Sequence, residues 1–262
     1  VDTMEWNRLT ALIGVRHQKE QVEGGYNASA TSPSFGLMYK LNNNVSVYGN
    51  WMQGLIPGTE VSKKYANKGQ YLDPVKTTQR EFGFKWDKGN LGGTLSYFHI
   101  NQQVAYADPV TNIYDYNGKQ QSKGASFTVY GDITEKLHLL GGMSFMNVKN
   151  IGGTYDGNRY CGTPKWIGTL AMTYDVTDAF SLNTRLMYNS SAWADNKNTK
   201  KIGAWTRLDL GAKYKWTNMK NPMTLSCNVI NVLGHKYWYG AGNNSVYLGT
   251  PRTFVVSLGI DF

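Results

Sequence analysis

The chain is poor in cysteine and has no long hydrophobic run. Its 262 residues include only two cysteines, Cys161 and Cys227, whose spacing predicts neither a disulfide framework nor a metal site. No apolar stretch approaches the roughly 18 residues that a transmembrane helix needs. The sequence starts at Val1 without a basic-apolar signal segment, so we expect a processed or truncated chain.

Acidic residues are also scarce, with 18 Asp and Glu against 27 Lys and Arg, and the formal net charge is +9. A basic excess often indicates binding to nucleic acid or to an anionic surface. Here the cations are scattered singly, which a solvated barrel interior explains better than a nucleic-acid patch, and we expect no nucleic-acid partner. Examples of this scatter are Arg80, Lys85, Arg185, Arg207 and Lys213.

The dominant positive feature is a period-two alternation of apolar and polar residues along the chain, which predicts β-strands. The last segment places Phe254, Val256, Leu258, Ile260 and Phe262 on one face of a strand, and Thr253, Ser257, Gly259 and Asp261 on the other. Helical spacing is not sustained anywhere. The pattern predicts an all-β antiparallel meander of about 12 strands, each near the length that crosses a membrane at a tilt.

The connections alternate between short and long, which is typical of a bacterial outer-membrane barrel with periplasmic turns. Short turns are expected at Leu41–Asn44, Lys88–Asn90, Asp132–Lys136, Val176–Asp178 and Thr217–Asn221. Long polar loops are expected near His17–Pro33, Gly54–Lys76, Val104–Gln120, Asn150–Pro164, Ala192–Gly203 and Gly234–Pro251. An even strand count would put both chain ends on the turn side, with Phe262 in the periplasm.

Residues 1–262 are interpreted as one domain, since no linker interrupts the series of predicted strands. Aromatic residues at strand ends beside the short turns fit a membrane-interface girdle. These are Trp86, Tyr174, Tyr214, Trp216 and Phe262. The resulting expectation is a multi-pass protein of the bacterial outer membrane with long extracellular loops.

The histidines do not indicate an outer-membrane lipase or protease. A nucleophile needs a base within hydrogen-bond reach and a group that orients the base. His99 has Ser96 three residues before it, on the opposite face of a regular strand. We therefore expect no enzyme, no catalytic residue, no cofactor and no protein-bound metal, and keep a barrel enzyme as the weakest alternative.

Four short stretches resemble the TonB-dependent siderophore receptors in order and spacing. Residues 74–85 resemble that family's loop-to-strand segment, and Ser122-Lys123-Gly124 resembles one of its strand starts. Residues 231–238 and Gly249–Thr253 are similar to the segments before its final strand. Departures from the family's pattern are Ser126, Val232 and Leu233, which concern barrel packing.

This resemblance implies that the chain is the carboxy-terminal portion of an outer-membrane β-barrel of about 22 strands, without the plug domain. It further implies a receptor for TonB-dependent uptake of a ferric siderophore, in which TonB acts through the plug. The implied partners are outer-membrane lipid, lipopolysaccharide and, through the terminal Phe262, the barrel-assembly machinery. Because the plug is missing, we expect the chain alone not to transport.

Recognition of a bulky polar chelate needs aromatic and hydrogen-bonding groups from the long loops, since the chelate itself coordinates the metal fully. The loop aromatics predicted to bind the ligand are Tyr114, Tyr116, Trp193 and Trp238. A hydroxamate-type chelate is the expected class. The loop cations Lys197, Lys200 and Lys201 could attract it or be solvated surface. A passive porin or an adhesin is the alternative function.

Overall fold

Thirteen antiparallel strands form one continuous sheet in the computed structural model, which describes residues 1–24, 27–216, 221–242 and 245–260. Each strand pairs with its neighbours along the chain, as a meander requires. In sheet order the strands are β1 (Asp2–Trp6), β2 (Leu9–Gln21), β3 (Asn27–Lys40), β4 (Val45–Ile56), β5 (Val75–Lys88), β6 (Leu91–Ala107), β7 (Tyr114–Thr134), β8 (Leu137–Ile151), β9 (Trp166–Asp175), β10 (Phe180–Asn189), β13 (Trp205–Trp216), β14 (Met223–Ile230) and β17 (Thr253–Ile260).

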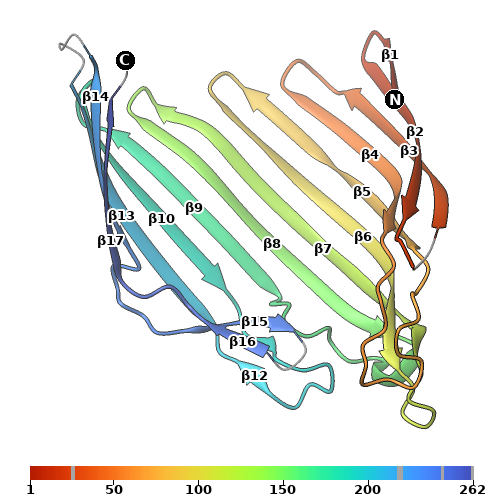
Figure 1. Ribbon diagram of the computed structural model, residues 1–262. Helices are drawn as coiled ribbons and strands as arrows, with labels where there is room; N and C mark the ends of the chain where they lie inside the picture. Colours follow the sequence, from red (N-terminus) through yellow and green to blue (C-terminus); the bar gives the residue numbers. More distant parts are fainter. Residues whose placement is uncertain (25–26, 217–220, 243–244, 261–262) are drawn as a thin grey trace.

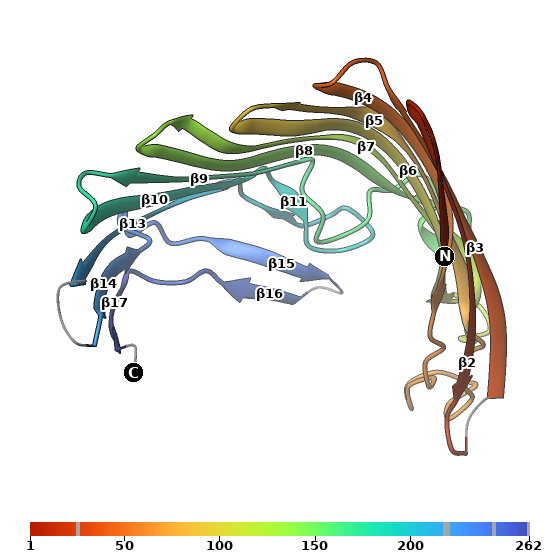
Figure 2. The same cartoon turned by 90° about the horizontal axis from the view of Figure 1, so that it is seen from above.

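The sheet curves into a trough, and the two small hairpins at one end fold toward its concave side (Figures 1 and 2). These hairpins are β11 (Ala192–Trp193) with β12 (Lys201–Ile202), and β15 (Trp238–Gly242) with β16 (Ser245–Leu248). A 3-10 turn, η1 (Gly153–Tyr155), lies in the loop between β8 and β9. Among the described residues, no helix is long and apolar enough to cross a membrane.

The register places apolar residues of successive strands on a single face of the sheet. Phe84 lies opposite Leu95, Leu95 opposite Phe127, and Phe127 opposite Met143. The same face continues through Leu182, Ala212, Cys227 and Val256 in the later strands. The apolar side chains on this face are more exposed than is usual, since Phe82 is 61% and Phe254 72% exposed. Such a broad apolar surface needs an apolar environment, which lipid supplies.

The opposite face is polar and concave. On β10, β13 and β14 it carries Asn183, Arg185, Arg207, Asp209 and Asn228. The last loop folds over this face, because the backbone N–H of Asn231 donates a hydrogen bond to Asp209 Oδ1 at 2.8 Å. The convex face is therefore the apolar one.

The short turns gather at one rim and the long connections at the other, as the sequence predicted. The aromatics Trp86, Tyr174, Tyr214 and Trp216 lie beside the short turns, and Trp86 stacks on Phe127 with ring centroids 5.6 Å apart. Phe262 lies outside the described residues. Ile260 pairs with Met223, so β17 runs toward the short-turn rim.

Several details of the prediction were wrong. The expected long loop at Val104–Gln120 is largely strand, because β6 extends to Ala107 and β7 begins at Tyr114. The expected long loop at His17–Pro33 is mostly strand, because β2 extends to Gln21 and β3 begins at Asn27. The first segment of the chain forms two strands, β1 and β2, joined by a tight turn at Asn7, where φ is 52°, so the sheet has 13 strands where about 12 were expected. Asp2 pairs with Ile13 midway along β2, so the first residues lie in the wall and not at the short-turn rim.

Candidate functional site

A cleft of about 450 Å³ opens at the long-loop end, where β6 ends and β7 begins. Its walls come from the loops between β4 and β5 and between β8 and β9, together with these strand ends. The cleft is distinguished by six tyrosines, which are Tyr65, Tyr106, Tyr114, Tyr116, Tyr155 and Tyr160. Tyrosine gives a rigid apolar face and a hydroxyl group, which suits recognition of a bulky, partly polar ligand.

Tyr114 is held from two directions. Its ring stacks on Tyr65 with centroids 4.6 Å apart and planes 12° apart. The side chain of Asn67 accepts a hydrogen bond from the Tyr114 backbone N–H at 2.9 Å and donates one to its carbonyl at 3.0 Å. Lys64 Nζ lies 4.9 Å from the Tyr65 ring centroid and adds a cation–π contact. The stack thus joins the β4–β5 loop to the start of β7.

The cleft has a buried base formed by Tyr106 and Asn150. Tyr106 is 9% exposed, and its hydroxyl donates a hydrogen bond to Asn150 Oδ1 at 2.5 Å. Tyr155 meets the Tyr106 ring edge-on, with centroids 4.9 Å apart. Asn150 is fully buried, and its Nδ2 has no hydrogen-bond partner in the described part of the chain.

Tyr160 and Tyr155 were not predicted as site residues. They come from the loop between β8 and β9, in the sequence Tyr155-Asp156-Gly157-Asn158-Arg159-Tyr160. Burial raises the pKa of the Tyr160 hydroxyl, and the neighbouring Cys161 and Tyr114 act in the same direction. The only sequence signal was two aromatics within one long polar loop.

The predicted residues Tyr114 and Tyr116 both line this cleft, whereas Trp193 and Trp238 do not. Trp193 lies on β11, where Lys201 Nζ is 5.9 Å from its ring centroid. Trp238 lies on β15 opposite Leu248 and is 51% exposed. The structure therefore separates the four residues into a tyrosine pair and two tryptophans on separate hairpins.

The β11–β12 hairpin nevertheless borders the cleft through Asn196, which is among the lining residues. Asn196 Oδ1 accepts a hydrogen bond from the Cys161 N–H at 3.1 Å, and its carbonyl accepts one from Asn158 Nδ2 at 2.9 Å. The Trp193 carbonyl accepts a bond from the Gly162 N–H at 2.7 Å. These bonds tie the hairpin to the loop that carries Tyr155 and Tyr160.

Asp195 orders the tip of this hairpin. Its carboxylate accepts hydrogen bonds from the N–H groups of Thr199 and Lys200 at 3.1 and 2.7 Å, and from the Thr199 hydroxyl at 3.1 Å. Burial disfavours the charged carboxylate, but these donors outweigh it, and the pKa of Asp195 is lowered from its ordinary 3.8.

A pH-dependent order of the hairpin follows from that lowered pKa. The stabilisation is complete above the ordinary pKa of 3.8 and is lost as the pH falls through the lowered value. We expect Asp195→Asn to increase amide exchange across residues 192–202 at neutral pH and to abolish the acid-induced increase. Hydrogen exchange by mass spectrometry at several pH values measures this, and an unchanged acid response in the variant would contradict it.

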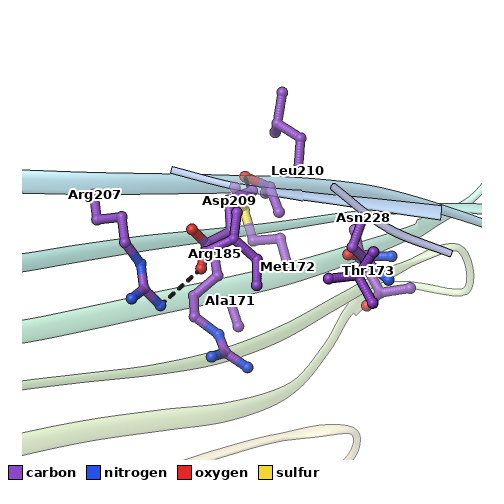
Figure 3. A pocket seen from close by; sticks show the side chains of 12 residues that line it. Ala171, Met172, Thr173, Arg185, Arg207, Asp209, Leu210 and Asn228 are labelled. Atoms are coloured by element: carbon purple, nitrogen blue, oxygen red, sulfur yellow. Dashed lines mark hydrogen bonds and ion pairs between the residues drawn. The ribbon is translucent and has the colours of Figure 1, made fainter. Parts of the chain in front are cut away.

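A second pocket, of about 410 Å³, lies on the concave wall formed by β9, β10, β13 and β14 (Figure 3). Arg207 Nη2 contacts Asp209 Oδ2 at 3.0 Å, while Arg185 forms no ion pair within the described residues. Figure 3 shows Leu210 pointing to one side of the wall and Arg185 and Arg207 to the other. The lumen side of this wall can thus attract anions.

Two of the histidines, His17 and His138, have partners other than those of a catalytic triad. His17 Nδ1 lies 3.1 Å from Thr31 Oγ1, and His138 instead contacts two carboxylates, Asp132 and Asp175 at 2.5 and 2.9 Å. Neither histidine has both a hydroxyl nucleophile and an orienting carboxylate. In the same part of the chain, no group of three or more His, Cys, Asp or Glu residues could hold a metal ion.

Known proteins resemble this chain in both sequence and structure. The ferrichrome receptor FcuA of Yersinia enterocolitica is 28% identical over 98% of the chain, and the metal-pseudopaline receptor CntO of Pseudomonas aeruginosa is 27% identical over 89%. The crystal structure of BauA, the ferric preacinetobactin receptor from Acinetobacter baumannii, covers 97% of the chain with a TM-score of 0.83 and 29% identity.

These relatives are much longer than the chain, which spans 37% of FcuA, 34% of CntO and 40% of the BauA chain. The family described as "TonB dependent receptor-like, beta-barrel" matches residues 1–232. That match covers most of the sheet and all of the tyrosine-lined cleft. The chain belongs to the β-barrel family of the TonB-dependent receptors.

Proposed function

We propose that the protein containing this chain is an outer-membrane receptor that takes up a ferric siderophore with energy from TonB. The observation that supports this most is the six-tyrosine cleft at the long-loop rim of a wall whose convex face is apolar. FcuA and BauA are named as receptors of ferrichrome and of ferric preacinetobactin, respectively. We infer that the protein binds and transports its ligand and does not act as an enzyme.

In this proposal the long loops are extracellular and the short turns periplasmic, as in bacterial outer-membrane barrels generally. The ligand enters the tyrosine cleft from outside, and the chelate retains its own coordination of iron. TonB acts through a plug domain of the complete protein. The terminal Phe262 directs barrel assembly, and lipid and lipopolysaccharide surround the convex face. Hydroxamate chelates such as ferrichrome are the first ligands to test.

The cleft makes a specific prediction about binding. Replacing both Tyr114 and Tyr116 with alanine removes two aromatic faces at the start of β7 and should weaken ferric-siderophore binding about tenfold or more, the effect expected of buried aromatic anchors. Binding to the purified full-length receptor can be followed by isothermal titration calorimetry. Tyr174→Ala, at the opposite rim, is the matched control and should bind normally.

Equal affinity of the double variant and the wild type would contradict the placement of the ligand in this cleft. The passive porin alternative predicts a different observation, which is steady ion conductance of the full-length protein in a planar bilayer. A closed protein that binds the chelate supports the receptor, whereas an open pore without chelate binding would contradict it.

A further inference from the structure

The tyrosine-lined cleft has one formal charge among the lining residues that the structure describes, which is the ammonium group of Lys64. No Asp or Glu belongs to this described lining, and its other polar side chains are those of Thr59, Gln102, Gln103, Asn196 and the six tyrosines. Ammonium, amide and hydroxyl groups all donate hydrogen bonds, whereas an ionised carboxylate only accepts them. The cleft is therefore rich in donors and suits a ligand that is rich in acceptor oxygens.

Backbone hydrogen bonds fix Lys64 at the wall of the cleft. The Lys64 carbonyl accepts a hydrogen bond from Asn112 Nδ2 at 3.1 Å, and the Asn112 carbonyl accepts one from the Ala66 N–H at 2.9 Å. These two bonds join the β4–β5 loop to the turn between β6 and β7. Since they involve only backbone groups of the β4–β5 loop, a change of the Lys64 side chain leaves both bonds in place.

The β4–β5 loop that carries Lys64 has a small core of its own. Val61 is 1% and Leu72 4% exposed. The Val61 N–H donates a hydrogen bond to the Gln70 carbonyl at 2.8 Å, and the Val61 carbonyl accepts one from the Gly69 N–H at 3.0 Å. A loop packed by its own side chains keeps a compact shape. The position of Lys64 relative to the cleft is therefore set before a ligand binds.

The Lys64 ammonium group has no acidic partner within the part of the chain that the structure describes. Its Nζ lies 4.9 Å from the ring centroid of Tyr65, which in turn stacks on Tyr114. The acids near the neighbouring turn, Asp108 and Asp115, accept hydrogen bonds from backbone N–H groups of their own segment. The positive charge of Lys64 is therefore left for a ligand.

Lys64 also reverses the charge preference that the aromatic rings alone would give. The face of a tyrosine ring attracts cations, so a cleft with six tyrosines and no cation would favour a cationic ligand. Here the Lys64 ammonium group lies over the Tyr65 ring and repels a second cation from the Tyr65–Tyr114 stack. The same ammonium group attracts an anion.

We propose that Lys64 is a specificity-determining residue, which makes the cleft prefer ferric chelates with a negatively charged group over neutral or cationic chelates of the same size. This inference rests on the proposed uptake function and deepens it, since it names the charge class of the ligand. The anionic group of the chelate lies beside the Tyr65–Tyr114 stack and pairs with Lys64, while the tyrosine rings contact the body of the chelate. Because Lys64 is exposed, salt screens this preference.

The test uses three linear ferric trihydroxamates that share one body and differ in the charge of one end. They are ferrioxamine B, which ends in an ammonium group, its neutral N-acetyl derivative, and its N-succinyl derivative, which ends in a carboxylate. Binding to the purified full-length receptor is measured by isothermal titration calorimetry. We expect the wild type to bind the succinyl form about five- to tenfold more tightly than the ammonium form at low salt. This ratio should shrink in about 1 M salt, where the screening length is about 3 Å.

Variants of the β4–β5 loop assign the preference to one side chain. Lys64→Gln should bring the ratio of the two affinities to about one or reverse it, and Lys64→Arg, which keeps the charge, should retain it. Lys63→Gln is the matched control, because it removes the same charge from the adjacent residue, which does not line the cleft, and it should also retain the ratio.

Two results would overturn the role of Lys64. One is equal affinity of the wild type for the three chelates, and the other is an equal change of the ratio in Lys63→Gln and Lys64→Gln. Either result leaves the proposed uptake function intact, since the chelates still bind. Absence of binding by all three chelates would instead contradict the proposed binding of hydroxamate chelates, and the inference about Lys64 with it.

Discussion

Replacing Phe127 with arginine is expected to destabilise the membrane-inserted protein by about 2–4 kcal/mol, the cost of a cation at the lipid-facing midplane of a barrel. Phe127 lies on the convex face midway between Lys123 and the short-turn rim. Its ring also stacks on Trp86, and this contact would be lost too. Reversible unfolding of the full-length protein from lipid vesicles in a urea or guanidinium series measures the change.

The neighbouring Thr128 provides the control for this prediction. It pairs with Thr94 and Gly142 on the concave face, where the side chain meets a polar interior. Thr128→Arg introduces the same side chain one residue away and should change the unfolding free energy much less. If both variants were destabilised equally, or Thr128→Arg more strongly, the assignment of the convex face to lipid would be wrong.

Replacing Asn231 with alanine should disorder the base of the last long loop. Asn231 is 1% exposed and has a φ of 54°. Its Nδ2 donates hydrogen bonds to the carbonyls of His235 and Thr250, both at 2.9 Å, and its Oδ1 accepts one from the His235 N–H at 3.1 Å. One side chain therefore holds both ends of the loop that carries the β15–β16 hairpin and Trp238.

The variant removes three hydrogen bonds to the backbone of His235 and Thr250, each worth about 1 kcal/mol net, so the local loss should be about 2–3 kcal/mol. Hydrogen exchange should rise across residues 232–250. Asn231→Gly accepts the positive φ without strain and separates backbone strain from lost hydrogen bonds. Hydrogen exchange in Asn231→Gly should therefore be only slightly lower than in Asn231→Ala.

Leu233→Ala, at a 60% exposed site of the same loop, is the control and should not change hydrogen exchange. Unchanged exchange in Asn231→Ala would contradict the role.

The sequence predicted the strands best where one face contacts lipid, because only there must every second residue be apolar. The pattern disappears where strands project beyond the apolar band. Gln18, Lys19 and Glu20 belong to β2, yet polar residues on both faces made them resemble a loop. The same reason explains why a loop was expected at Val104–Gln120, where β6 in fact extends to Ala107 and β7 begins at Tyr114.

The candidate site was only half predictable for a different reason. Loop aromatics indicated ligand binding in general, but which loops converge depends on the curvature of the sheet and on contacts between loops. Asn67 binds the backbone of Tyr114, 47 residues later, and Asn196 binds that of Cys161, 35 residues earlier. No local pattern encodes these pairings. The structure brings Tyr114 and Tyr116 into one cleft with Tyr155 and Tyr160, whereas Trp193 and Trp238 lie on separate hairpins, and ligand binding stays a prediction for all four predicted residues.

The central claim is that the convex face of the sheet contacts lipid and the concave face contacts water. Spin labels placed singly at residues 124–130 of β7, in the full-length receptor within a lipid bilayer, test it most directly. Collisions of each label with oxygen, which concentrates in lipid, are compared with collisions with a water-soluble nickel chelate. We expect oxygen collisions to peak at Ala125, Phe127 and Val129, and nickel collisions to be relatively higher at Ser126 and Thr128. Equal accessibility at all positions, or an alternation of the opposite phase, would contradict a lipid-facing convex surface.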